Sequence, residues 1–167
     1  QTRLSRSTVS QYRIAVADLV ESFTWSNQPN EQSGLNAHYY KSKSMRDKEK
    51  IIERLDATVR QQFGEGTPGE KFDKPDEFSI LWDGSLVVDE TGWYDFVLRT
   101  ENGGRLFVND SENALIDAYV KSGDTNEYTG SRFLLAGRLY PIRLNWFKFR
   151  EKTASVELLW KPPHREV

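Results

Sequence analysis

Trp93-Tyr-Asp-Phe-Val-Leu-Arg-Thr100 is the stretch that decides the fold class, because apolar and polar side chains alternate along it. Tyr94, Phe96 and Leu98 fall on one phase, and polar side chains such as Asp95 fall between them. Successive side chains of a β-strand point to opposite faces of a sheet. The pattern therefore predicts a strand with one buried face.

The same alternation recurs in Tyr140–Trp146, and shorter runs bounded by Gly, Asn or Asp predict more strands. Many short antiparallel strands form a sandwich or a barrel. We therefore expect an all-β fold, an antiparallel β-sandwich. The other expected strands are Leu35–Tyr40, Phe78–Trp82 before a turn at Asp83-Gly84, Arg105–Asn109, Ala114–Asp117, Ser131–Leu135 and Ala154–Trp160.

Two segments have helical spacing. Ser7–Phe23 predicts an amphipathic helix, and the polar stretch Ser26–Ser33 has the composition of a linker. In Asp47–Phe63 the apolar spacing fits a helix, while its second half, Thr58–Phe63, fits a strand equally well. We expect an N-terminal helix and linker over residues 1–33, the sandwich over 34–162 and a short tail over 163–167.

Composition excludes several classes of function. The 167 residues suffice for one domain, and 5 Trp, 7 Tyr and 9 Phe supply a core. The 23 Lys and Arg nearly balance 25 Asp and Glu, so we expect no nucleic-acid partner. No apolar run is long enough for membrane insertion. Absence of Cys excludes disulfides and Cys-ligated metals, and His38 and His164 lack the spacing of a zinc site.

A series of sequence blocks follows in a recognisable order. The blocks are Gly34-Leu-Asn-Ala-His-Tyr-Tyr40, Phe78-Ser-Ile-Leu-Trp-Asp-Gly84, Gly92-Trp-Tyr-Asp-Phe-Val-Leu-Arg-Thr100, Gly104–Asn109, Leu115–Asp117, Leu135–Gly137, Tyr140–Leu144 and Val156–Trp160. In this order the chain resembles the PA-fourteen domain, named after the fourteen-kilodalton fragment of a toxin's protective antigen. The opening Arg3–Leu19 resembles, over a shorter stretch, a segment of large bacterial exported proteins that also carry c-type haem domains.

The resemblance implies a β-sandwich that is appended to or inserted in glycosidases, adhesins, toxins and bacterial surface proteins, where its proposed role is carbohydrate binding. It favours the strand over the helix near Thr58–Phe63. It also implies a secreted, periplasmic or cell-surface location. No catalytic motif emerges from the residues, so we expect an accessory module and not an enzyme.

In sugar-binding members of the family, two consecutive aspartates after the Gly92-type strand hold calcium. Glu101 and Asn102 stand at that place, and one carboxylate with one amide is a poorer ligand set for calcium. We consider calcium and ligand binding by Glu101, Asn102 and the amide of Gly103 beside the simpler interpretation, an ordinary turn that favours Asn and Gly.

Two further places, besides Trp93, are candidates for glycan contact. Lys148-Phe149-Arg150 begins a basic loop between the last two strands, which suits an acidic saccharide or is an ordinary solvated hairpin. Asp117 and Tyr119 follow a short strand where the resemblance implies pocket residues, although such an aspartate also caps turns.

The position of each tryptophan in the alternation of its strand predicts whether it lies in the core or on the surface. Trp82, Trp146 and Trp160 fall on inward phases and predict core positions, whereas Trp93 falls on the outward phase. Trp93 is therefore either a sugar-stacking residue or one covered by a loop.

These observations predict a noncatalytic carbohydrate-binding module of a larger bacterial protein, with polysaccharide or glycan bound by loops at one end of the sandwich. The alternative is a structural module that docks on flanking domains and has lost sugar and calcium binding. A hydrolase ranks third, because 25 acidic residues make carboxylate pairs unavoidable and therefore uninformative.

Overall fold

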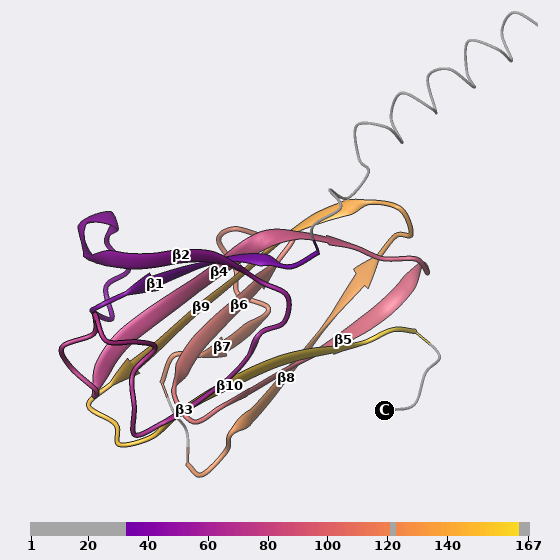
Figure 1. Ribbon diagram of the computed structural model, residues 1–167. Helices are drawn as coiled ribbons and strands as arrows, with labels where there is room; N and C mark the ends of the chain where they lie inside the picture. The colour runs from indigo at the N-terminus through magenta and orange to yellow at the C-terminus, as the bar shows by residue number, and fades with distance from the viewer. Residues whose placement is uncertain (1–32, 121–122, 164–167) are drawn as a thin grey trace, which may run out of the picture. The chain divides into compact units, whose positions relative to one another are not determined.

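The computed structural model describes residues 33–120 and 123–163, which form two antiparallel β-sheets with almost no helix. The sheets lie face to face as two layers (Figure 1), so the expected β-sandwich is confirmed. The expected N-terminal helix and its linker up to Gln32 lie outside the described residues, as does His164. The elements are β1 (Leu35–Tyr40), η1 (Asp47–Glu49), β2 (Lys50–Asp56), β3 (Arg60–Gly64), β4 (Glu77–Val87), β5 (Gly92–Thr100), β6 (Gly103–Val108), β7 (Ile116–Ala118), β8 (Glu127–Leu134), β9 (Leu139–Phe149) and β10 (Ala154–Lys161).

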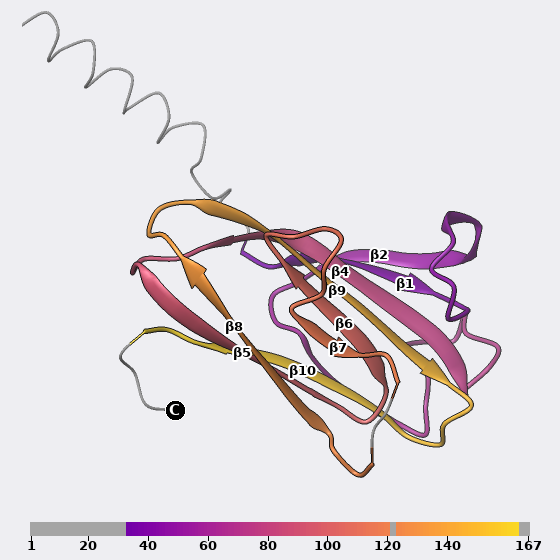
Figure 2. The ribbon, with the colours of Figure 1, turned by 180° about the vertical axis from the view of Figure 1, so that it is seen from behind.

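We call the six-stranded sheet, in the order β2-β1-β4-β9-β6-β7, sheet A, and the four-stranded sheet, β3-β10-β5-β8, sheet B. The view from behind shows the same two layers (Figure 2). In the middle of sheet A, β4 pairs with β9 from Glu77↔Phe149 to Val87↔Leu139. The end near Phe149 is the loop end of the sandwich, and the end near Leu139 is the far end.

The helical interpretation of Asp47–Phe63 is wrong. After the short η1, the segment forms β2, which pairs with β1, and β3, which pairs with β10. Each of these edge strands has one pairing partner, β1 for β2 and the distant β10 for β3, and local apolar spacing does not reveal such partners. The strand expected near Thr58–Phe63 is confirmed as β3.

The turn expected at Asp83-Gly84 is also wrong, because β4 continues through it to Val87. Gly84 is needed there for close packing and not for a turn. A Cβ on Gly84 would lie 2.8 Å from Cδ2 of Leu35 on the neighbouring strand. A glycine inside a strand often marks such a close approach.

The core lies between the sheets, where the inward side chains of both meet. Trp82 and Trp146 are fully buried, as expected. Trp160 shares the inward phase of Leu158, but 48% of its surface is exposed, so its assignment to the core is wrong. The phase is right, but Trp160 lies at the far end, where the layers part around a pocket.

Candidate functional site

Two loops meet at the loop end of the sandwich, the β5–β6 turn and the β9–β10 loop. Asn102 joins them, because its Nδ2 donates hydrogen bonds to the Thr153 carbonyl at 3.0 Å and to the Glu151 carboxylate. Its Oδ1 accepts the Ser155 backbone N–H at 3.2 Å. Only 5% of Asn102 is exposed, so its side chain holds the loops together and does not face solvent.

These contacts decide how well the β5–β6 turn suits calcium. The Asn102 side-chain oxygen is buried and accepts the Ser155 N–H, so the Glu101 carboxylate is the more accessible oxygen ligand of the pair. Calcium requires about six to eight oxygen ligands. No group of three or more His, Cys, Asp or Glu that could hold a metal occurs in the part of the chain that the structure describes. The residues at this turn therefore do not fit a calcium site.

The buried hydroxyl of Thr100 also holds this turn, through hydrogen bonds on its core side. Thr100 Oγ1 accepts the Trp146 indole N–H at 2.8 Å and the Asn102 backbone N–H at 3.0 Å. It lies 2.9 Å from the Ser155 carbonyl, to which it donates its own proton. The turn is thus tied to β9 and β10 through one core side chain, which gives the outward residues around it a rigid support.

Gly103, just after the turn, makes room for an aromatic ring on the outer face of sheet A. Gly103 pairs with Phe147, and a Cβ on Gly103 would lie 2.3 Å from Cζ of that ring. Phe147 packs edge-on against Tyr119, with 4.8 Å between ring centroids. Both rings are half-buried, and they lie side by side at the loop end of β9, β6 and β7.

Arg105 and Asp117 form an ion pair beside these rings. Arg105 Nε donates to Asp117 Oδ2 at 3.0 Å, and the Arg105 guanidinium lies 4.0 Å from the Tyr119 ring centroid. Desolvation alone would raise the pKa of Asp117. The hydrogen bonds from Arg105 and from the Tyr119 backbone N–H outweigh that effect and hold the pKa of the carboxyl below its usual value.

The basic loop is smaller than the sequence indicated, because β9 extends to Phe149. Lys148 is not a loop residue: it is fully buried in β9, and its Nζ donates to the Lys152 carbonyl at 3.0 Å. It is therefore withdrawn from the ligand-contacting residues. Phe149 faces outward, with Lys43 Nζ at 3.8 Å and the Arg150 guanidinium at 4.9 Å from its ring centroid.

We call this group of outward side chains the aromatic–cation cluster. Its rings belong to sheet A and to the segment after β7, and each of two rings has a cation over it. The members are Tyr119, Phe147, Phe149, Lys43, Arg105 and Arg150.

Trp93 is not part of this cluster. It starts β5 at the far end, where Gly92 pairs with Leu134, and it projects from the outer face of sheet B. Trp93 has the outward phase and is exposed over 62% of its surface, which contradicts the alternative that a loop covers it. The structure thus brings Gly103, Asp117, Tyr119 and the Phe149–Arg150 pair to one surface and leaves Trp93 on another.

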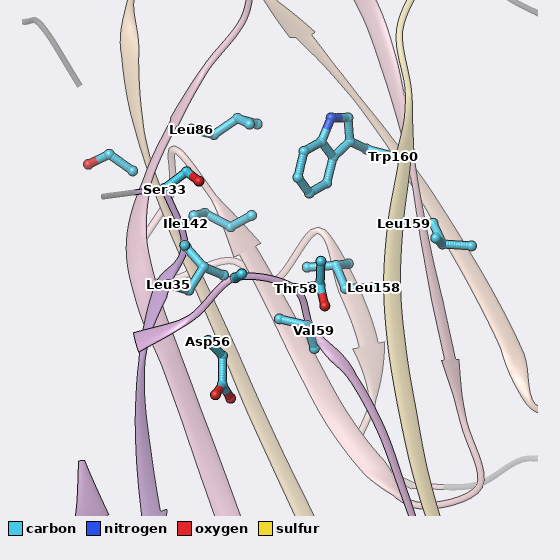
Figure 3. Close-up of a pocket in the computed structure, with 13 residues that line it drawn as sticks. Ser33, Leu35, Asp56, Thr58, Val59, Leu86, Ile142, Leu158, Leu159 and Trp160 are labelled. Carbon is cyan, nitrogen blue, oxygen red and sulfur yellow. The ribbon is translucent and has the colours of Figure 1, made fainter. Parts of the chain in front are cut away.

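A pocket of about 390 Å³ opens at the far end, between the layers. In Figure 3 the Trp160 indole points into it, with Leu86, Ile142 and Leu158 around it. The Asp56 carboxylate points away, and it accepts hydrogen bonds from Tyr39, Trp82 and Arg54. Such a lining suits an apolar group better than a sugar with many hydroxyls.

The two-layered β-sandwich and the order of its sequence blocks define the class of domain. The family model described as PA14 domain matches residues 31–166. The chain belongs to that family.

Individual relatives are similar over most of this chain. Anti-sigma-I factor RsgI3 of Acetivibrio thermocellus is 30% identical over 137 residues, which are 81% of this chain and 20% of that protein. A solved anti-sigma factor domain-containing protein is 28% identical, with a TM-score of 0.71, over 81% of this chain and 45% of that one. The chain thus spans less than half the length of either relative.

A more distant structure shares the fold. The A domain of epithelial adhesin 6 from Candida glabrata, solved in complex with Galb1-3GlcNAc, has a TM-score of 0.65 and 14% identity. The match covers 83% of this chain and 84% of that domain. No helix in the described part of the present chain is long and apolar enough to cross a membrane.

Proposed function

We propose that this domain is a noncatalytic carbohydrate-binding module of a larger extracytoplasmic bacterial protein. One observation carries the proposal: Tyr119 and Phe147 lie side by side on the outer face of sheet A, next to the Arg105–Asp117 pair. Aromatic rings beside fixed hydrogen-bonding groups are what a sugar ring requires, because one part of a sugar is apolar and the rest is hydroxyl. The sugar complex of the adhesin domain supports the class of ligand.

The charges of the aromatic–cation cluster favour an acidic saccharide. Lys43 and Arg150 lie over Phe149, and Arg105 lies over Tyr119. A uronic acid carboxylate would pair with these cations while its ring rests on an aromatic side chain. Since Asn102 is occupied by protein partners, binding proceeds without calcium in this proposal.

Binding to polygalacturonate, measured by affinity electrophoresis and calorimetry, tests the proposal. We expect Tyr119→Ala and Arg105→Gln each to weaken binding about tenfold, the effect of losing one ring or one charged contact. Arg138→Gln is the matched control, because Arg138 is exposed in the turn between β8 and β9 at the far end. A chelator should change nothing.

A wild-type domain that binds neither polygalacturonate nor any member of a glycan panel would contradict the proposal. If a chelator abolishes binding, the ligand is held through calcium, and the hypothesis of a calcium site at Glu101 and Asn102 is the better one. Folding of each variant is checked by its thermal transition.

The second candidate is a docking module for other parts of a longer protein. The apolar pocket favours it, since Trp160 and Leu159 leave 48% and 37% of their surfaces exposed at the far end. If this is the function, the domain binds no glycan, and Trp160→Ala weakens its association with the flanking domains of the longer protein.

A further inference from the structure

A second group of exposed aromatic side chains lies on the outer face of sheet B, away from the aromatic–cation cluster. Trp93 on β5 and Phe133 on β8 are register partners, and their ring centroids are 5.7 Å apart. Their exposed fractions are 62% and 48%. We call these two residues the aromatic platform.

Among the described residues, one acid and one base lie in the next strand position beside the platform. In the next position along the strands, Ser131 donates a hydrogen bond to Asp95 at 2.5 Å, and Lys161 is the register partner of Asp95 on the other side. Within the described residues, no cation lies over either ring of the platform. Asp95 and Lys161 therefore offer hydrogen-bonding groups beside the two rings, and their opposite charges leave no net electrostatic field.

Ion pairs cover the part of this outer face that lies nearer the loop end. Arg99 Nε lies 2.7 Å from Glu127, and Arg99 Nη1 lies 3.4 Å from Glu157, which is also 3.3 Å from Arg60 Nε. These pairs occupy the part of sheet B nearer the loop end. The uncovered rings are confined to the far end, so any ligand of this face is held there.

We propose that the aromatic platform is a second glycan site, and that it takes a single chain of a neutral polysaccharide with equatorial linkages and hydroxyls, such as a β-1,4-glucan or xylan. Equatorial substitution leaves flat C–H surfaces on both sides of the sugar ring, which stack on an aromatic face. The two platform rings are inclined at 73°, so one can stack on a sugar while the other forms a side wall. A single chain fits this shape, whereas a flat crystalline surface requires coplanar rings.

The platform is too small to hold a second copy of the chain. A large aromatic side chain has roughly 150–250 Å² of surface. At their exposed fractions the two rings therefore offer on the order of 200 Å². A stable protein interface buries about 800 Å² per partner. A glycan, which binds weakly through few contacts, needs no such area.

Calorimetry with cellohexaose and xylohexaose tests this proposal, which does not depend on the acidic ligand of the other face. We expect Trp93→Ala to weaken binding about five- to tenfold, the effect of removing one stacked ring. Trp93→Phe should recover most of the affinity. Leu139→Ala, which truncates an exposed apolar residue elsewhere at the far end, is the control and should bind as wild type.

Three results would overturn the proposal. One is a wild-type domain that binds neither oligosaccharide, and another is equal affinity of wild type and Trp93→Ala. The third is a concentration-dependent dimer that Trp93→Ala abolishes in sedimentation, which would assign the platform to a second copy. Arg105→Gln separates the two faces: if it lowers cellohexaose binding and Trp93→Ala does not, the neutral chain lies on sheet A. A wild-type domain that binds cellohexaose but not polygalacturonate would remove the acidic ligand proposed for sheet A and leave the platform proposal standing.

Discussion

The two outer faces of the sandwich both carry aromatic rings, but the cations lie differently relative to the rings on each face. On sheet A, cations lie over Tyr119, Phe149 and Phe107. On sheet B, Arg99 pairs with Glu127 and Glu157 nearer the loop end, and no cation of the described residues lies over the platform rings. On sheet A, Arg105 lies over its ring even though it also pairs with Asp117, so the two faces differ in where the cations lie relative to the rings. One face is therefore suited to acidic ligands and the other to neutral ones.

The largest expected effect comes from removing the side chain that supports the sheet A site. Asn102→Ala leaves the Ser155 N–H and the Thr153 carbonyl without their buried partner. We expect the free energy of unfolding to fall by about 2–4 kcal/mol, and polygalacturonate binding to fall with it.

Urea denaturation and calorimetry measure the two effects of Asn102→Ala. Asn126→Ala is the control, because Asn126 contributes its backbone carbonyl to Thr100 and its side chain is exposed. Cellohexaose binding should survive in the folded fraction. Equal stability of the two variants would show that the polar contacts of Asn102 do not hold the loop end together.

Adding one methyl group to the sheet A site should have the next largest effect. In Gly103→Ala the new Cβ must displace the Phe147 ring from Tyr119, at a cost of about 1–3 kcal/mol. Thermal unfolding and polygalacturonate affinity should both decrease. Gly69→Ala is a matched control, since no atom lies within 4 Å of the added Cβ. An unchanged affinity would mean that the paired rings do not contact the glycan.

Salt should separate the two faces without any mutation. Raising the ionic strength from about 0.05 M to about 0.5 M shortens the screening length, and we expect roughly a tenfold loss of polygalacturonate affinity. Cellohexaose affinity should stay within about twofold, because the platform carries no net charge. Equal salt dependence for the two ligands would contradict the division into an acidic and a neutral site.

The smallest expected effect concerns pH. The lowered pKa of Asp117 means that its ion pair with Arg105 stabilises the fold above the usual carboxyl pKa of about 4. That contribution is lost as the pH falls through the lowered pKa of the folded state. For this largely exposed pair we expect at most about 1 kcal/mol. Denaturation of wild type and Asp117→Asn should differ at pH 6 and converge near pH 2, and a constant difference would show that the pair does not titrate.

The sequence was sufficient for the fold wherever a strand has one buried face. Alternation identified β5 and β9 directly, and phase placed Trp93 on the outward face but left open whether a loop covers it. Local spacing failed in Asp47–Phe63, where β2 pairs with β1 and β3 with the distant β10. It also failed at Asp83-Gly84, where Leu35 packs closely on Gly84. The alternation correctly placed Trp160 on the inward side of its strand. It could not show that the opposite sheet ends before it can cover this residue.

The candidate site was predicted less completely. Gly103, Asp117, Tyr119 and Phe149 reach one surface, whereas Asn102 turns inward. Phe147 and Arg105 were missed, although Phe147 has the outward phase between Trp146 and Lys148. The signal that would have found them is the register of β6 on β9, which places Phe147 against Gly103, and a single sequence does not contain that register.

The opposite orientation of the two outer faces has a mechanical consequence. Sheets A and B are the two layers of the sandwich, so their outer faces point in opposite directions (Figure 1). A domain with a glycan on each face would hold two different polymer strands and would act as a crosslink within a mixed matrix of acidic and neutral chains. Its contribution would then be measured as the viscosity or stiffness of the mixed polymer, a property that neither polymer would show with the domain alone.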